Sequence, residues 1–251
     1  MIDEKESFNV KDYLNRIVQE PLKVFQEFVL WTDKDKEDFK LLLDTLRSPY
    51  DKNIETAKSK GDRLERLVEF IIKKSYFFEI YKNVHTEMNE IDEVIVFSNR
   101  GKQALKSFGI SRELIPIKEN LFLGECKNYA NDLGVTYVGK FYSLMTVSDV
   151  SMGIIFTQKG LTGKPEGFKD AYGLTKVLRM IETSKNKDDD FYILTFSDED
   201  YDKLLTGTTF FELIEAKKLE LRLASNYKTF ISDNKHEAEE EIRTIITSIE
   251  P

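Results

Sequence analysis

The sequence predicts an α/β protein whose central β-sheet is mixed and flanked by helices on both faces. Between residues 61 and 196, segments with apolar residues at helical spacing alternate with short runs rich in β-branched and aromatic residues. Such alternation is typical of a sheet covered by helices. Glycine and proline are sparse, at 12 and 5 of 251 residues, and no repeat or low-complexity linker is found, which favours a compact architecture.

Helices are also expected before this alternating region. Phe25, Phe28 and Val29 lie at helical spacing. Thr32 or Asp33 could cap a following helix, which the sequence ends at Pro49. This block, residues 1–58, contains no recognisable chemistry, so we interpret it as a helical extension for packing or for contact with a partner.

The remaining elements follow in chain order. An amphipathic helix is expected over 61–74, a turn with a short helix over 99–106, and further helices over 135–147, 169–183, from Ser197, over 208–223 and over 235–249. Strands are expected over 77–84, 91–97, 114–118, 121–127, 152–157 and 191–196. The sequence therefore predicts a core over 59–196 and C-terminal helices over 197–251 that pack on it.

Composition limits the class of protein. Apolar residues make up 41% and aromatic residues 12% of the chain, which is enough for a core. The N-terminus is charged, and no apolar run approaches the roughly 18 residues that span a bilayer. A single cysteine excludes an intramolecular disulfide and a cysteine-based zinc site. We expect a cytoplasmic protein without a membrane partner.

Several chemistries are excluded by missing residues. His85 and His236 are the only histidines, which argues against histidine-rich metal sites, and no Gly-x-Ser-x-Gly motif is present. The run from Gly160 to Pro165 lacks the first glycine and the final Ser or Thr of a phosphate-binding loop, so it predicts a plain loop. The net charge of −8 argues against nucleic acid, but lysines and arginines gather between residues 159 and 187, so charge does not decide.

One strand carries charged groups where a sheet is usually apolar. Glu125 and Lys127 are two residues apart and share a face, whereas Cys126 points to the other side. Asp92 belongs to a neighbouring strand. Carboxylates are the ligands that Mg²⁺ prefers, the main-chain carbonyl of Cys126 offers another oxygen, and a lysine can orient a water and stabilise charge on a phosphate. These residues predict a site for phosphodiester hydrolysis.

The same residues, in order, resemble the PD-(D/E)xK superfamily of nucleases, and most closely its Mrr-like branch of restriction endonucleases. The matching segments cover roughly residues 60–196: Lys60-Gly61-Asp62-Arg63-Leu64-Glu65, Ile91-Asp92, Glu125-Cys126-Lys127 and Gly153-Ile154-Ile155-Phe156-Thr157. The resemblance implies a restriction-endonuclease-like core. It also implies metal ligation by Asp92, Glu125 and Cys126, catalysis by Lys127, and an assisting acid at Glu65.

The resemblance further implies a Mg²⁺- or Mn²⁺-dependent endonuclease that acts on DNA, double-stranded rather than single-stranded, in bacterial restriction or antiviral defence. RNA or branched DNA is a weaker alternative. A different class also fits the acidic composition and the helical extensions: an inactive nuclease-fold subunit that binds nucleic acid or assembles with a partner or a second copy.

Alternatives remain for the single residues. Glu90 competes with Asp92 as the metal ligand, because both can share one strand face. Asp92 and Glu125 are 33 positions apart, which requires residues 99–120 to form an insertion between the two strands. Glu125 and Lys127 could be an ion pair at a strand end, and Glu65 could be a surface acid paired with Lys60 or Arg66.

Overall fold

The computed structural model of the chain describes residues 20–49, 57–85, 90–164, 167–185 and 190–223. Its centre is a five-stranded sheet in the order β1-β2-β3-β4-β5. The first three strands are antiparallel and the last three parallel, so the sheet is mixed, as predicted. The strands are β1 (Phe78–His85), β2 (Glu90–Phe97), β3 (Leu121–Lys127), β4 (Met152–Thr157) and β5 (Tyr192–Phe196).

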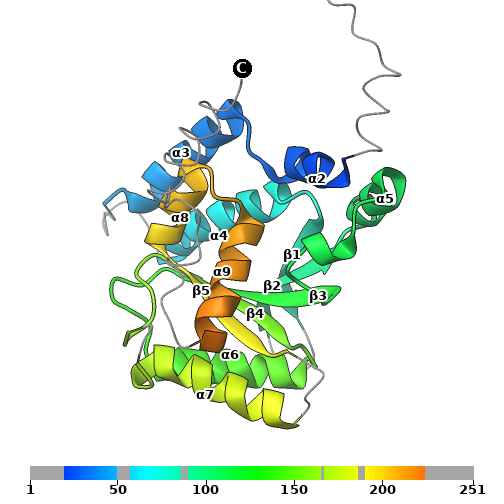
Figure 1. Cartoon of the computed structure of the whole chain (residues 1–251). Helices are drawn as coiled ribbons and strands as arrows, with labels where there is room; N and C mark the ends of the chain where they lie inside the picture. The colour runs from blue at the N-terminus through cyan, green and yellow to red at the C-terminus, as the bar shows by residue number, and fades with distance from the viewer. Residues whose placement is uncertain (1–19, 50–56, 86–89, 165–166, 186–189, 224–251) are drawn as a thin grey trace, which may run out of the picture.

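Helices cover both faces of this sheet (Figure 1). One face packs on α6 (Val135–Val147) and α7 (Asp170–Lys185), which lie side by side. The other face packs on the remaining helices, which share one apolar cluster. They are α2 (Pro21–Val29), α3 (Asp33–Arg47), α4 (Ala57–Lys74), α5 (Asn99–Phe108), α8 (Asp198–Thr206) and α9 (Phe210–Leu223). The α/β class with helices on both faces is confirmed.

The N-terminal helices are part of the main core. Phe25 of α2 stacks on Phe77 and on Phe211, with ring centroids 5.5 and 5.9 Å apart. Phe39 of α3 is fully buried in the same cluster. Residues 1–19 of the predicted extension, and the predicted helix over 235–249, lie outside the described residues. None of the helices in the described ranges is long and apolar enough to cross a membrane.

Capping residues set several helix ends where the sequence predicts them. Thr32 caps α3 and not Asp33: its hydroxyl accepts from the Asp35 amide, and the Asp35 carboxylate accepts from the Thr32 amide. Ser197 and Asp200 form the equivalent box at the start of α8. The helix that ends at Lys74 begins at Ala57, four residues before the position predicted.

The predicted strand over 114–118 is wrong. A 3₁₀ turn (Arg112–Leu114) and an irregular segment occupy this region. The Arg112 guanidinium donates to the carbonyls of Ile115, Lys118 and Glu119, so a side chain satisfies groups that a strand would pair along a ladder. Pro116 also lacks an amide proton. Burial of Ile115 and Ile117 explains why the segment looks like a strand.

Candidate functional site

The candidate site lies where β2 and β3 run antiparallel. Their register places Glu93 opposite Gly124, and its continuation brings Asp92 beside Glu125. The long connection between the two strands is filled by α5 and the 3₁₀ turn, so the 33-position separation is accommodated as an insertion. Along β3 the side chains alternate, so Glu125 and Lys127 face one layer of the molecule and Cys126 faces the other. Asp92 is joined to the first layer by its ion pair with Lys127, and Glu93 to the second by its hydrogen bond with Cys126.

Three side chains meet directly on the first of these layers. The Lys127 Nζ lies 2.8 Å from the Asp92 Oδ2 and 2.8 Å from the Glu125 Oε1. The two carboxylate oxygens are therefore no farther apart than twice that distance. The Cys126 amide also donates to the Asp92 Oδ2, at 3.2 Å, and so fixes this carboxylate against β3. We call Asp92, Glu125 and Lys127 the triad.

The triad is partly shielded from solvent, with side-chain exposures of 28% for Asp92, 20% for Glu125 and 24% for Lys127. Burial raises the pKa of Glu125, and the negative charge of Asp92 adds to the rise while Lys127 opposes it. Burial by itself lowers the pKa of Lys127, but its hydrogen bonds to Asp92 and Glu125 outweigh this and raise it. Lys127 therefore stays a cation at neutral pH.

Glu65 is placed in a different environment from the triad. It lies on α4, which packs on the layer that holds Glu93 and Cys126. Its negative charge helps to raise the pKa of both Glu93 and Cys126. Among the described residues, the ion pairs of the triad involve no Glu65 oxygen. The assisting role of Glu65 stays a prediction.

Glu93 is a buried acid that the sequence interpretation missed. It is fully buried, and its Oε1 accepts from the Cys126 thiol at 3.3 Å. Burial raises its pKa to about 8, and the charges of Asp92 and Glu65 act in the same direction. Gly124 leaves room for it, because a Cβ there would lie 2.6 Å from the Glu93 Oε2. The sequence pattern could have predicted its burial, because Glu93 shares a strand face with the apolar residues Ile95 and Phe97.

Asp92, rather than Glu90, is the strand β2 acid that the structure shows in contact with Lys127. Asp92 bonds both to Lys127 and to the Cys126 amide. The side chains of Glu90 and His85 lie outside the described part of the structure.

The segment from Gly160 to Lys164 is a loop that pairs with Leu133 through Leu161, and it does not lead directly into a helix, as a phosphate-binding loop does.

The donor set of the triad suits a hard cation that retains water. In the described residues, no group of three or more His, Cys, Asp or Glu side chains is arranged to hold a metal. Mg²⁺, however, is commonly held by one or two carboxylates together with water and substrate oxygens. Asp92, Glu125 and the Cys126 carbonyl, which belongs to the same stretch of β3, provide such a set. These oxygens are of the chemical kind that Mg²⁺ binds, and the metal itself stays a prediction.

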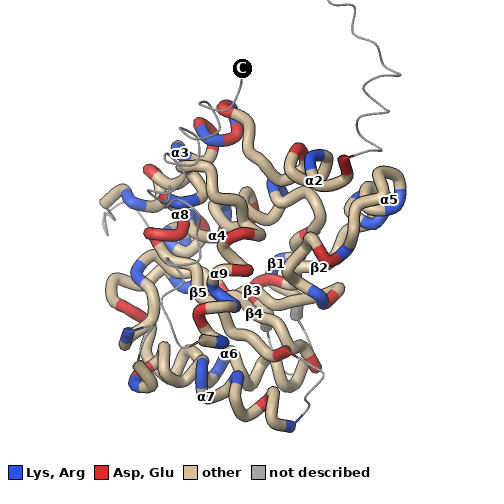
Figure 2. The backbone as a smooth tube through the Cα atoms, in the orientation of Figure 1, with Lys and Arg blue, Asp and Glu red and all other residues tan. Residues whose placement is uncertain are grey.

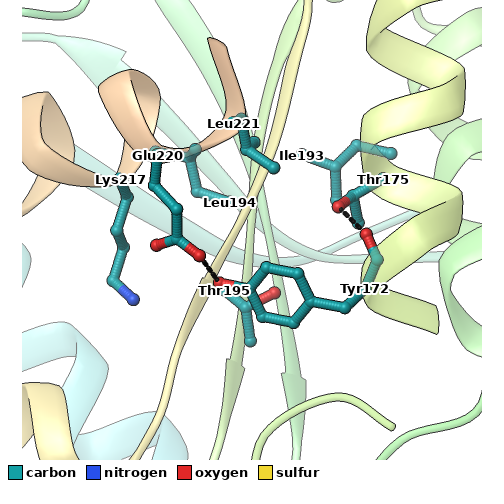
Figure 3. Close-up of a pocket in the computed structure, with 8 residues that line it drawn as sticks. All are labelled: Tyr172, Thr175, Ile193, Leu194, Thr195, Lys217, Glu220 and Leu221. Atoms are coloured by element: carbon teal, nitrogen blue, oxygen red, sulfur yellow. Dashed lines mark hydrogen bonds between the residues drawn. The ribbon is translucent and has the colours of Figure 1, made fainter. Parts of the chain in front are cut away.

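A second polar cluster joins β5, α7 and α9 (Figure 3). The Tyr172 hydroxyl donates to Glu220, and Lys217 forms an ion pair with Asp200 at 2.9 Å. Lys217 and Asp200 have side-chain exposures of only 6% and 0%. The cavity among these groups has a volume of about 10 Å³, which is about the space of one water. The hydrogen bond and ion pair of this cluster therefore hold buried polar groups together in the core, and the cavity has no room for a substrate.

A wider hollow of about 630 Å³ opens at the opposite end of the sheet from the triad. It lies between the segment before β3, the start of β5 and α9. Basic and acidic side chains line it in nearly equal number: Arg112, Lys118, Lys218 and Arg222 against Glu113, Asp190 and Glu215. Charges of both signs are interspersed along the backbone as well (Figure 2). The hollow therefore selects no single charge type of ligand.

Comparison with known proteins adds no identification: no family model, no curated protein and no solved structure matches the chain.

Proposed function

We propose that this protein is a metal-dependent endonuclease with a restriction-endonuclease-like core, which hydrolyses phosphodiester bonds of DNA in the bacterial cytoplasm. The observation that carries the proposal is the triad: one lysine ammonium 2.8 Å from each of two carboxylates that come from adjacent strands. The mixed sheet with helices on both faces supports this core. A setting in restriction or antiviral defence rests on the sequence resemblance alone.

The roles of the residues follow from their environments. Asp92 and Glu125 provide carboxylate oxygens, and the Cys126 amide holds Asp92 in place. Lys127 remains protonated, so it can orient a water and stabilise the negative charge that develops on the phosphate. A divalent cation bound to Asp92, Glu125 and the Cys126 carbonyl would supply Lewis-acid charge and lower the pKa of a bound water. Glu65, which the resemblance makes an assisting acid, would act through its charge on Glu93 and Cys126 and not through a bond to the triad.

A second function is favoured by the same bonds. Because Lys127 already pairs with both carboxylates, the triad could be a closed ion-pair network in a subunit that binds nucleic acid or a partner without cutting. Such a network would hold β2 to β3 and would need no cation. The two functions differ in one property, which is divalent-metal-dependent cleavage.

Cleavage of supercoiled plasmid and of single strands tests the proposal. With Mg²⁺ or Mn²⁺, we expect the wild-type chain to cut. Glu125→Ala and Lys127→Ala should each reduce the rate at least about 10²- to 10³-fold, the usual effect of removing one charge-stabilising group. Lys106→Ala, on the exposed face of α5, is the matched control and should cut at the wild-type rate. Absence of wild-type cleavage with either metal would leave the binding or assembly function.

A further inference from the structure

Two tyrosines form an aromatic surface beside the triad. Tyr129 follows Lys127 by two residues and is 45% exposed. Tyr137 belongs to the first turn of α6. Their ring centroids are 5.2 Å apart and their planes are inclined by 44°. What distinguishes the pair is its position: two rings in contact at the edge of a charged site offer a flat face on which a planar ligand can stack.

The pair is electrostatically connected with the triad. The pKa of Tyr129 is raised, first by its hydrogen bond with Tyr137 and then by burial, and the charges of Lys127 and Glu125 act on it in opposite directions. The loop that carries Tyr129 is also fixed at its start, where the Asn128 Nδ2 donates to the Lys60 carbonyl at 2.8 Å. The ring of Tyr129 is therefore presented from an anchored segment.

Exposed lysines lie on the segments next to those that carry the two rings. The loop after β4 pairs with the loop of Tyr129, since the Leu133 amide donates to the Gly160 carbonyl and the Thr162 amide to the Leu133 carbonyl, each at 2.9 Å. This places the exposed Lys159 and Lys164 on the neighbouring loop.

Lys140 is exposed one helical turn after Tyr137. Asp132 is an exposed acid on the Tyr129 loop. Lys140, Lys159 and Lys164 form no ion pair with the residues that the structure describes. These three ammonium groups are therefore available to a ligand that carries phosphates.

We propose that Tyr129 and Tyr137 stack on unpaired bases of a DNA strand whose phosphates contact Lys140, Lys159 and Lys164. Bases in a duplex already stack on their neighbours, so an exposed ring gains a partner only where the strand is unpaired. This inference rests on the proposed nuclease and narrows its substrate to DNA with single-stranded segments, in place of the intact duplex that the resemblance implies.

Binding to metal-free protein tests the inference separately from cleavage. Fluorescence anisotropy in EDTA would compare a labelled single strand of mixed sequence with the duplex that it forms with its complement. Tyr129→Ala should weaken single-strand binding about 5- to 150-fold, the usual range for one lost base stack. Tyr129→Phe, which keeps the ring, should bind within about threefold of wild type. Tyr81→Ala removes a tyrosine that is 52% exposed on β1 and should bind like wild type.

A strand with abasic sites provides the second measurement. Wild type and Tyr129→Ala should bind it equally, because the base that stacks on the ring is missing. The inference is overturned if Tyr129→Ala weakens duplex and single strand alike, if Tyr129→Phe loses as much as Tyr129→Ala, or if wild type does not bind single strands. Single-strand binding that depends on the Tyr129 ring, without cleavage in Mg²⁺, would instead contradict the proposed nuclease and leave the stacking surface standing.

Discussion

At the scale of single residues, Glu93 makes stability depend on pH. Its pKa is about 8 in the folded chain, against an ordinary value of 4.5. Between these values the unfolded chain releases the proton and the folded chain keeps it, so stability falls as pH rises. The loss should be of the order of a few kcal/mol. We expect Glu93→Gln to flatten this part of the profile, measured by urea unfolding in EDTA from pH 5 to 8. Parallel profiles for the two proteins would contradict the raised pKa.

Gly124 is the residue that makes room for Glu93. An added Cβ would lie 2.6 Å from the Glu93 Oε2 and 3.0 Å from its Cβ. Gly124→Ala should therefore cost about 1–3 kcal/mol of unfolding free energy through overpacking, and Glu93→Ala in the same chain should recover part of the loss. Gly139→Ala is the control, since it meets no atom within 4 Å in α6 and should be neutral or stabilising. Equal effects of the two glycine substitutions would refute the account of Gly124.

At the scale of single residues, the sequence predicts which side chains lie together only where they are a fixed interval apart on one strand. A two-residue interval along a strand placed Glu125 and Lys127 on one side, and the structure brings Asp92 to them. The position of Glu65 could not be derived in this way. Which layer a helix covers is decided by packing between distant segments, and here α4 covers the layer of Glu93 and Cys126.

At the scale of elements, the Asp200–Lys217 ion pair joins α8 to α9. Asp200 is fully buried and also accepts from the Ser197 amide at 2.8 Å, so it both caps α8 and neutralises Lys217. Asp200→Ala should lower the free energy of unfolding by about 3–5 kcal/mol, because it leaves a buried charge without this carboxylate. Asp202→Ala, which removes an exposed partner of Arg47 on the same helix, should cost less than about 1 kcal/mol. A similar loss in both variants, measured by urea unfolding, would contradict the distinction.

Element boundaries followed from the sequence where local signals were strong. The strand over 121–127 and the helix over 135–147 have the predicted bounds, because the apolar pattern that predicts each of them acts within a few positions. The prediction of a strand over 114–118 was wrong because a residue outside this segment determines its hydrogen bonds. Arg112 satisfies its carbonyls from outside the local pattern, and no periodicity reports such a contact.

At the scale of the whole molecule, the N-terminal helices and the sheet share one core. The sequence divides residues 1–58 from the core at 59–196, yet Trp31 packs on Phe39 of α3 and on Phe70 of α4, with ring centroids 4.6 and 5.5 Å apart. The ring contacts that tie segments so distant in sequence cannot be derived from composition.

This packing predicts one cooperative transition. Trp31 is the only tryptophan, so its fluorescence reports on the N-terminal helices, whereas far-ultraviolet circular dichroism reports on the whole chain. The two signals should have the same urea midpoint. A fluorescence transition at lower urea would instead identify the N-terminal helices as a separately folding unit.

The central claim is that Asp92 and Glu125 can hold one divalent cation together. Calorimetric titration of the full chain with Mn²⁺ tests this claim without requiring a substrate. We predict one Mn²⁺ per chain, with binding at least about tenfold weaker in Asp92→Asn and in Glu125→Gln, since each removes a charged ligand. Glu79→Gln, an exposed acid on β1, should bind like wild type. Equal affinity in wild type and both site variants, or no binding by wild type, would contradict the account.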